Sequence, residues 1–204
     1  ATETILKDKN KIVDISAIMT STTLTDEQKM ELLGKAVNLT TKNNIKNMID
    51  SIKKSTDLTD DQKSVLLEQA YEHQLIIAES MSDVKSIINF IMKSDYLTDE
   101  QRNQLIEYAY ERYLSLARNI NDIKSIISDI LKNSILSEEQ KNSLVEKGFS
   151  TQIQFSTTFD NIKGRIKEIQ NSTSEYSSKS LKVISHILFI TSIIETGNSS
   201  GIIP

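Results

Sequence analysis

Few residues of this chain have the type and spacing that catalysis or metal binding requires. His73 and His186 are its two histidines, and neither belongs to an HExxH motif or to another pair with metal-ligand spacing. Glycine loops for nucleotides, a GxSxG nucleophile motif and cysteine–histidine pairs do not occur. Carboxylates are numerous, but helix caps and charged helix faces, such as the one with Glu68 and Glu72, account for most of them. We therefore expect no enzyme activity, no cofactor and no metal, with His73 on the polar side of its helix.

Residue types that suit protein binding cluster between residues 108 and 118. Tyrosine and arginine are enriched in interaction hot spots. Tyr110 lies 39 residues from both Tyr71 and Phe149, so we expect it in the core. The other two tyrosines of the cluster stand where neighbouring repeats have glutamine, and a solvated or inter-repeat role is the alternative for them. The candidate partner-binding residues here are Tyr108, Arg112 and Tyr113.

The most apolar stretch runs from Leu181 to Ile194. Its 14 residues include Lys182 and His186, and a transmembrane helix needs about 20 apolar residues. We expect a helix that covers the end of the repeats; docking on a partner and insertion into a membrane are the alternatives. A polar linker over residues 172–180 precedes it, and a flexible tail over residues 195–204 follows. A second set of candidate partner-binding residues is Ile187, Phe189 and Ile190.

Composition narrows the class of protein further. With 28 acidic and 24 basic residues the net charge is −4, which disfavours a broad basic surface for nucleic acid. There is no cysteine, so disulfides and thiolate metal sites are excluded while the compartment stays open. Five glycines and one proline leave little material for hairpin turns, which disfavours strands. The first residues show no basic segment followed by an apolar one, so we expect no signal peptide in this form.

A hexapeptide recurs four times and explains much of the chain. It reads LTDEQK, LTDDQK, LTDEQR and LSEEQK, beginning at Leu24, Leu58, Leu97 and Leu136. The last three copies lie 39 residues apart, and the first two lie 34 residues apart. A threonine or serine followed three residues later by glutamine is a capping box, so each copy predicts the start of a helix, with Thr59, Thr98 and Ser137 as N-caps.

The apolar residues after each motif follow a helical period. They predict a long helix, over residues 60–81 in the second copy, and a short helix of about 12 residues before each following motif. Ser82 with Asp83 and Asn121 with Asp122 are the expected caps of two short helices. Positions that stay apolar in every full copy should form the core: Leu66, Ala70, Leu105, Ala109, Ile88, Ile91, Ile127 and Ile130.

The sequence thus predicts an all-α fold of tandem helical hairpins, each a short helix plus a long helix in about 39 residues. Such a period is typical of helices stacked as a short solenoid, and a closed helical bundle is the alternative. We expect one helical repeat domain over residues 1–171, with four units of which the first is shortened.

These features favour a non-catalytic structural or scaffold protein that acts through protein–protein interaction. A composition rich in Lys, Asn, Ile and Ser suits an AT-rich microbial or viral genome, so we expect a protein partner or a homo-oligomer in such an assembly. The alternatives are a surface-displayed, adhesin-like helical module that binds a host protein, and a membrane-active protein that uses its C-terminal apolar helix. Nucleic acid and membrane are the less favoured partners, and no small-molecule substrate is indicated.

Overall fold

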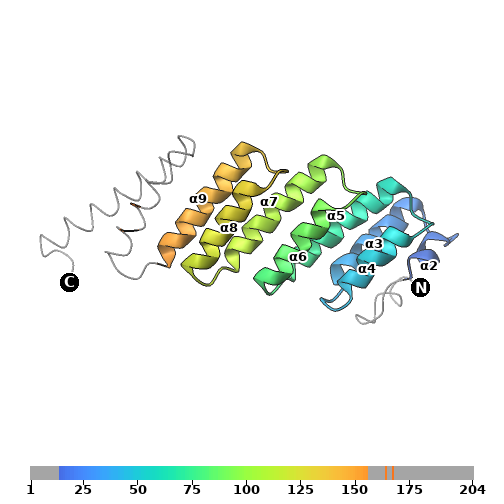
Figure 1. Ribbon diagram of the computed structural model, residues 1–204. Helices are drawn as coiled ribbons and strands as arrows, with labels where there is room; N and C mark the ends of the chain where they lie inside the picture. Colours follow the sequence, from blue (N-terminus) through green and yellow to red (C-terminus); the bar gives the residue numbers. More distant parts are fainter. Residues whose placement is uncertain (1–13, 156–163, 165–166, 168–204) are drawn as a thin grey trace, which may run out of the picture. The chain divides into compact units, whose positions relative to one another are not determined.

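The computed structural model describes residues 14–155 together with residues 164 and 167 (Figure 1). Within these residues the chain forms eight helices and no strand, so the fold is all-α as predicted. The expected linker, apolar helix and tail over residues 172–204 lie outside the described residues. The chain divides into two compact units, residues 1–112 and residues 113–204, and the division falls inside one helix.

The first unit contains the described helices α2 to α6 and most of α7. Short and long helices alternate along it, and the long ones begin at the predicted positions. The bounds are α2 Ile15–Met19, α3 Asp26–Leu39, α4 Ile45–Lys54, α5 Asp60–Ile76, α6 Met81–Met92 and α7 Asp99–Ser115. The second unit contains α8 Ile120–Lys132 and α9 Glu138–Gln154.

All four capping boxes predicted from the hexapeptide are confirmed. In each, the hydroxyl oxygen of the cap residue accepts the amide of the glutamine three residues on at 3.2 Å. The glutamine Oε1 in turn accepts the amide of the cap residue at 2.9 to 3.0 Å. The caps are Thr25, Thr59, Thr98 and Ser137. Each box satisfies two amides that have no partner inside the helix, which fixes where the long helices begin.

The predicted end of the long helix at residue 81 is wrong. Helix α5 stops at Ile76 after 17 residues, because the Asp83 carboxylate accepts the amides of Glu79 and Ser80 at 3.3 and 3.1 Å. In a continuing helix those amides would bond to carbonyls one turn back. Met81 accordingly begins the next short helix instead of ending the long one.

The predicted caps of the short helices are also wrong, by two residues. Ser80 caps α6 and Asn119 caps α8, in place of Ser82 and Asn121. The aspartates that we paired with them, Asp83 and Asp122, are instead the third residues of these helices, and each reaches back toward the residues before its helix.

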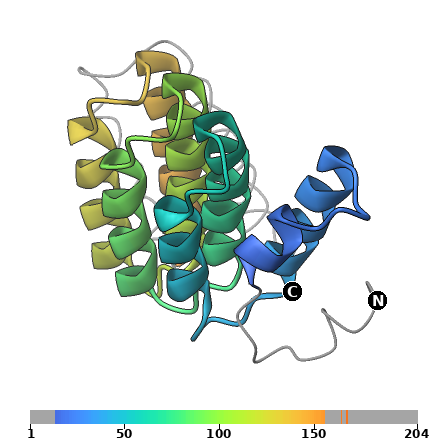
Figure 2. The same ribbon diagram turned by 90° about the vertical axis from the view of Figure 1, so that its right-hand side faces the viewer.

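Helix α5 is the centre of the first unit. It packs against α3, α4 and α6. Figure 2 shows the short helices α4 and α6 in one layer and α5 in another. In the second unit α8 packs against α9. The eight residues predicted for the core are confirmed, because every one of them is buried. The helical period of the apolar residues therefore predicts correctly which positions are buried.

Candidate protein-binding groove

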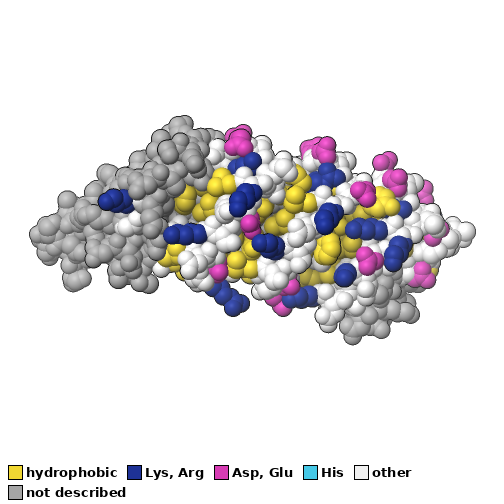
Figure 3. Space-filling model, in the orientation of Figure 1, with side chains coloured by type: hydrophobic (Ala, Val, Ile, Leu, Met, Phe, Trp, Pro, Cys, Tyr) yellow, Lys and Arg dark blue, Asp and Glu magenta, His cyan; other side chains and the backbone are white. Residues whose placement is uncertain are grey.

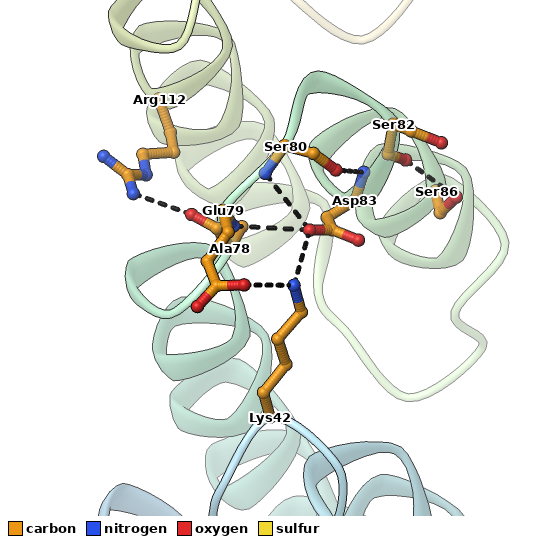
Figure 4. A network of polar contacts seen from close by, with 8 residues as sticks. All are labelled: Lys42, Ala78, Glu79, Ser80, Ser82, Asp83, Ser86 and Arg112. Atoms are coloured by element: carbon orange, nitrogen blue, oxygen red, sulfur yellow. Dashed lines mark hydrogen bonds and ion pairs between the residues drawn. The ribbon is translucent and has the colours of Figure 1, made fainter.

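The tyrosine and arginine cluster of α7 does not form an exposed patch. Tyr108 is half-buried, and Tyr113 is only 5% exposed because it lies one turn beyond the buried Ala109 on the apolar side of the helix. The Arg112 Nη2 donates to the backbone oxygen of Ala78 at 2.7 Å, so this guanidinium already has an acceptor inside the protein (Figure 4). The other candidate residues, Ile187, Phe189 and Ile190, lie outside the described part of the chain.

His73 is not the plain surface residue that its neighbours suggest. It is half-buried, and its Nε2 lies 2.8 Å from the backbone oxygen of Thr40, the residue that ends α3. His73 and Arg112 are 39 residues apart, and each reaches a carbonyl at or just beyond the end of the preceding long helix. Such carbonyls lack partners within their own helix, so donors from the next long helix satisfy them.

A groove opens in the first unit because α3 and the turn after it are short. Helix α3 has 14 residues against 17 in α5, and Thr40 at its end lies level with His73. The last turn of α5 and the residues after it therefore continue beyond α3. The groove has a volume of about 250 Å³. Three segments line it: Lys42, Ile45 and Lys46 around the start of α4; Gln74, Ile77 and Ala78 at the end of α5; and Ser82, Asp83, Ser86, Ile87 and Phe90 of α6.

An ion network closes one rim of this groove (Figure 4). The Lys42 Nζ lies 2.9 Å from Glu79 Oε2 and 3.0 Å from Asp83 Oδ2. Hydrogen bonds to Glu79 and then Asp83 raise the pKa of Lys42 above its usual range. The hydrogen bond from Lys42, followed by those from Ser80 and the Glu79 amide, lowers the pKa of Asp83. Lys42 and Asp83 are therefore both charged at neutral pH, and the Lys42 ammonium joins the side chains of Glu79 and Asp83.

The rest of the groove is largely apolar. Ile45 and Ile87 are buried, while the Phe90 side chain on the rim is 45% exposed. In the region of α4, α5 and α6, Figure 3 shows apolar side chains between basic ones on the surface. An aromatic side chain left this open beside a cavity is a feature of binding surfaces, because aromatic residues are enriched among interaction hot spots.

The first turn of α4 differs from those of the short helices α6 and α8. Helices α6 and α8 have side-chain caps, whereas no side chain caps α4. Asn44 stands 39 residues before Asp83 and 78 before Asp122, and α4 has no acidic residue in its first turn. The backbone bonds at this turn use the amides of Asn44, Ile45 and Met48. The amides of a helix's first turn have no partner inside the helix, so without a side-chain cap or an acidic residue the positive end of α4 favours a negative group.

Sequence reasoning missed this groove, although two signals pointed to it. The first is the 34-residue interval between Leu24 and Leu58 where the later intervals are 39. The second is Asn44, an amide at a position where the next repeats have a carboxylate. Neither signal says by itself that the shortening leaves a cavity, because a neighbouring side chain of sufficient size would have filled it.

Among the described residues, no group of three or more histidine, cysteine or carboxylate side chains is arranged to hold a metal ion. No helix in that part of the chain is long and apolar enough to cross a membrane. The groove can bind an apolar side chain or a short segment of chain, and it offers a positive charge beside it. No protein-family model matches this chain, and comparisons with curated proteins and with solved structures find no significant match.

Proposed function

We propose that this chain is a non-catalytic scaffold protein of a larger microbial or viral assembly, and that it acts by binding a protein partner through the groove between α4, α5 and α6. The observation that carries the proposal is the groove itself, with Phe90 45% exposed on its rim. In protein–protein interfaces, aromatic side chains of this kind are enriched relative to the rest of the protein surface.

The repeated residues support the same proposal, because their roles are structural. Leucines and isoleucines of the register are buried, and the threonine, serine and glutamine of each hexapeptide cap a helix. We therefore expect the binding residues at positions where one unit differs in sequence or length from the others. The shortened first unit is the clearest departure, and it coincides with the groove.

We further propose that the units are stacked helical hairpins in the manner of a short solenoid. Helix α5 contacts both a preceding long helix, α3, and the short helices on either side of it in the sequence. In a stacked array each unit buries its apolar face on the next, and surfaces that differ between units become the binding surfaces. A groove at a shortened unit is consistent with such an array.

Affinity capture from the native source tests the proposed function. The tagged full chain and the Phe90→Asp variant are compared by mass spectrometry, and Val65→Asp is the matched control because Val65 is also 45% exposed but does not line the groove. We expect one or a few proteins that the wild type and Val65→Asp retain and that Phe90→Asp loses. Retention of the same proteins by all three chains would show that the groove is not the interface.

A further inference from the structure

We infer that the groove binds an acidic peptide segment of its partner, with an apolar side chain over Ile77, Ile87 and Phe90 and a carboxylate at the first turn of α4. The inference rests on the proposed function and adds the chemistry of the partner. It depends on three features of the groove: its size, the positive charge of Lys46, and the side-chain oxygen of Gln74, which is buried without a hydrogen-bond partner among the described residues.

The size of the groove favours a peptide side chain over a small molecule. Its volume of about 250 Å³ is below the roughly 300–1,000 Å³ of typical small-molecule sites. Its apolar surface comes from the isoleucines and Ala78, and Phe90 extends that surface onto the rim. One or two apolar side chains of a bound segment fill such a space, while the rest of the segment lies along the rim.

The charge that the groove offers is positive. Lys42 is occupied by Glu79 and Asp83, and Asp83 also accepts two backbone amides. Lys46 lines the groove and has no ion-pair partner within the described residues. It lies in the uncapped first turn of α4, where the open amides add to the positive potential. A carboxylate placed there would pair with Lys46, and it would supply the negative charge that the first turn of α4 lacks and that Asp83 and Asp122 supply in α6 and α8.

Gln74 supplies a third point of contact. It lines the groove, and its Oε1 is buried without a hydrogen-bond partner among the described residues. A buried acceptor in this state gains from any donor that reaches it. The backbone N–H groups of a bound segment are such donors, and a purely apolar ligand has none.

Peptide selection on the intact chain tests the inference. Random 12-residue peptides displayed on phage are selected against the full chain, and the enriched sequences are synthesised with a fluorophore and measured by anisotropy. We expect enrichment of sequences with Leu, Ile or Phe within a few residues of Asp or Glu. Lys46→Glu should weaken their binding about tenfold, since it replaces an attraction by a repulsion. Lys54→Glu makes the same charge change on the same helix outside the groove and should leave binding within about twofold.

Asn44→Asp separates a binding role from a structural one. The new carboxylate would add a negative charge at the start of α4, near Lys46, where the peptide carboxylate is proposed to bind. We expect it to raise Tm by about 1–4 °C and, in the same protein, to weaken peptide binding about tenfold. A substitution that damaged the fold would instead lower both the Tm and the affinity for the peptide.

Three results would overturn the inference: no enriched peptide, enrichment of basic peptides, or binding that Lys46→Glu and Asn44→Asp leave unchanged. Dimerisation lost in Phe90→Asp but kept in Val65→Asp, measured by analytical ultracentrifugation, would identify a second copy of the chain as the occupant and overturn it as well. If affinity capture from the native source still finds proteins whose binding is lost in Phe90→Asp, the proposed scaffold function stands and only the acidic character of the partner is excluded.

Discussion

At the residue scale, equivalent positions of the repeat have taken different polar roles. His73 and Arg112 reach the carbonyl groups of Thr40 and Ala78 near the ends of the preceding long helices. Thr151 stands at the same position of the next copy, and its hydroxyl donates to Lys147 O in its own helix at 2.9 Å. A threonine is too short to reach a neighbouring helix, so the link between successive long helices depends on the length of one side chain.

Tyr71 provides a prediction about a buried hydroxyl. The side chain is fully buried, and its hydroxyl has no hydrogen-bond partner within the described residues. The ring fills the core, but the oxygen loses its water without replacement, and Phe149 occupies the equivalent position of a later copy. We expect Tyr71→Phe to increase the free energy of unfolding by about 1 kcal/mol. Urea denaturation measures it, and a loss of stability would show that the hydroxyl has a partner.

Asp83 provides a prediction about pH. Its pKa in the folded chain lies below the ordinary value of 3.8, mainly because of Lys42, so its contribution to stability is present above that value and is lost as the pH falls through the lowered pKa. The wild type should therefore be more stable than Asp83→Asn at pH 7 and pH 5, and the difference should shrink once the pH falls below 3.8 and disappear below the lowered pKa. Asparagine keeps an oxygen for the Ser80 amide, so the comparison isolates the charge.

Denaturation of both proteins at several pH values, in low and high salt, measures this effect. Asp83 and Lys42 are each partly exposed, so high salt should reduce the difference at pH 7. A difference that persists unchanged at pH 2 would assign the effect to hydrogen bonding by the neutral side chain and contradict the proposed ion network.

At the element scale, two glycines within long helices differ in what surrounds them. A Cβ on Gly148 of α9 would lie 2.9 Å from Ile127 Cγ1 of α8, in a close contact between helices. A Cβ on Gly34 of α3 would lie 2.8 Å from Gln69 Oε1, the end of a flexible side chain. Alanine favours a helix over glycine by about 1 kcal/mol, so the neighbour decides the sign of each substitution.

We therefore expect Gly34→Ala to stabilise the protein by up to about 1 kcal/mol, because the Gln69 amide can turn away. Gly148→Ala should destabilise it by about 1–3 kcal/mol through overpacking against Ile127. In an Ile127→Ala background the second substitution should become favourable, because the clashing atoms are gone. Thermal denaturation of the single and double variants checks this, and a destabilising Gly148→Ala in both backgrounds would contradict the assigned contact.

At the scale of the whole molecule, the proposed stacking predicts that an entire unit can be removed. Deleting residues 60–98 joins Thr59 to Asp99 and keeps the capping box, the register and the alternation of helices. We expect a soluble protein with unchanged helicity per residue and a lower Tm, because a stacked array loses one unit and one interface. Circular dichroism and a melting curve measure both quantities.

Deletion of residues 60–79 is the control, because it removes α5 alone and leaves its neighbours without the helix on which they pack. We expect that shorter deletion to bind a hydrophobic dye and to aggregate. If both deletions fold equally badly, the helices form a closed bundle in which no unit is dispensable.

The helical class, the start of each long helix and the buried residues of the repeat can be predicted from the sequence alone. These follow from local rules: a capping box satisfies amides within four residues, and an apolar period of three to four residues specifies one buried face. Leu66, Leu105 and Ile130 are buried for this reason, and Thr59 and Thr98 are caps. Local rules predict the ends of the long helices less well. Helix α5 ends where it does because Asp83, which belongs to the following helix, accepts the amides of Glu79 and Ser80.

Which surfaces remain open depends on how the helices pack, and local sequence rules do not give it. Tyr108 and Tyr113 both stand where a neighbouring repeat has glutamine, yet the first is half-buried and the second is buried. The groove arises because a five-residue difference between two intervals of the repeat leaves the end of α5 uncovered. Whether such a difference leaves a cavity depends on side chains from three segments, Lys46, Gln74 and Phe90 among them, that the fold alone brings together.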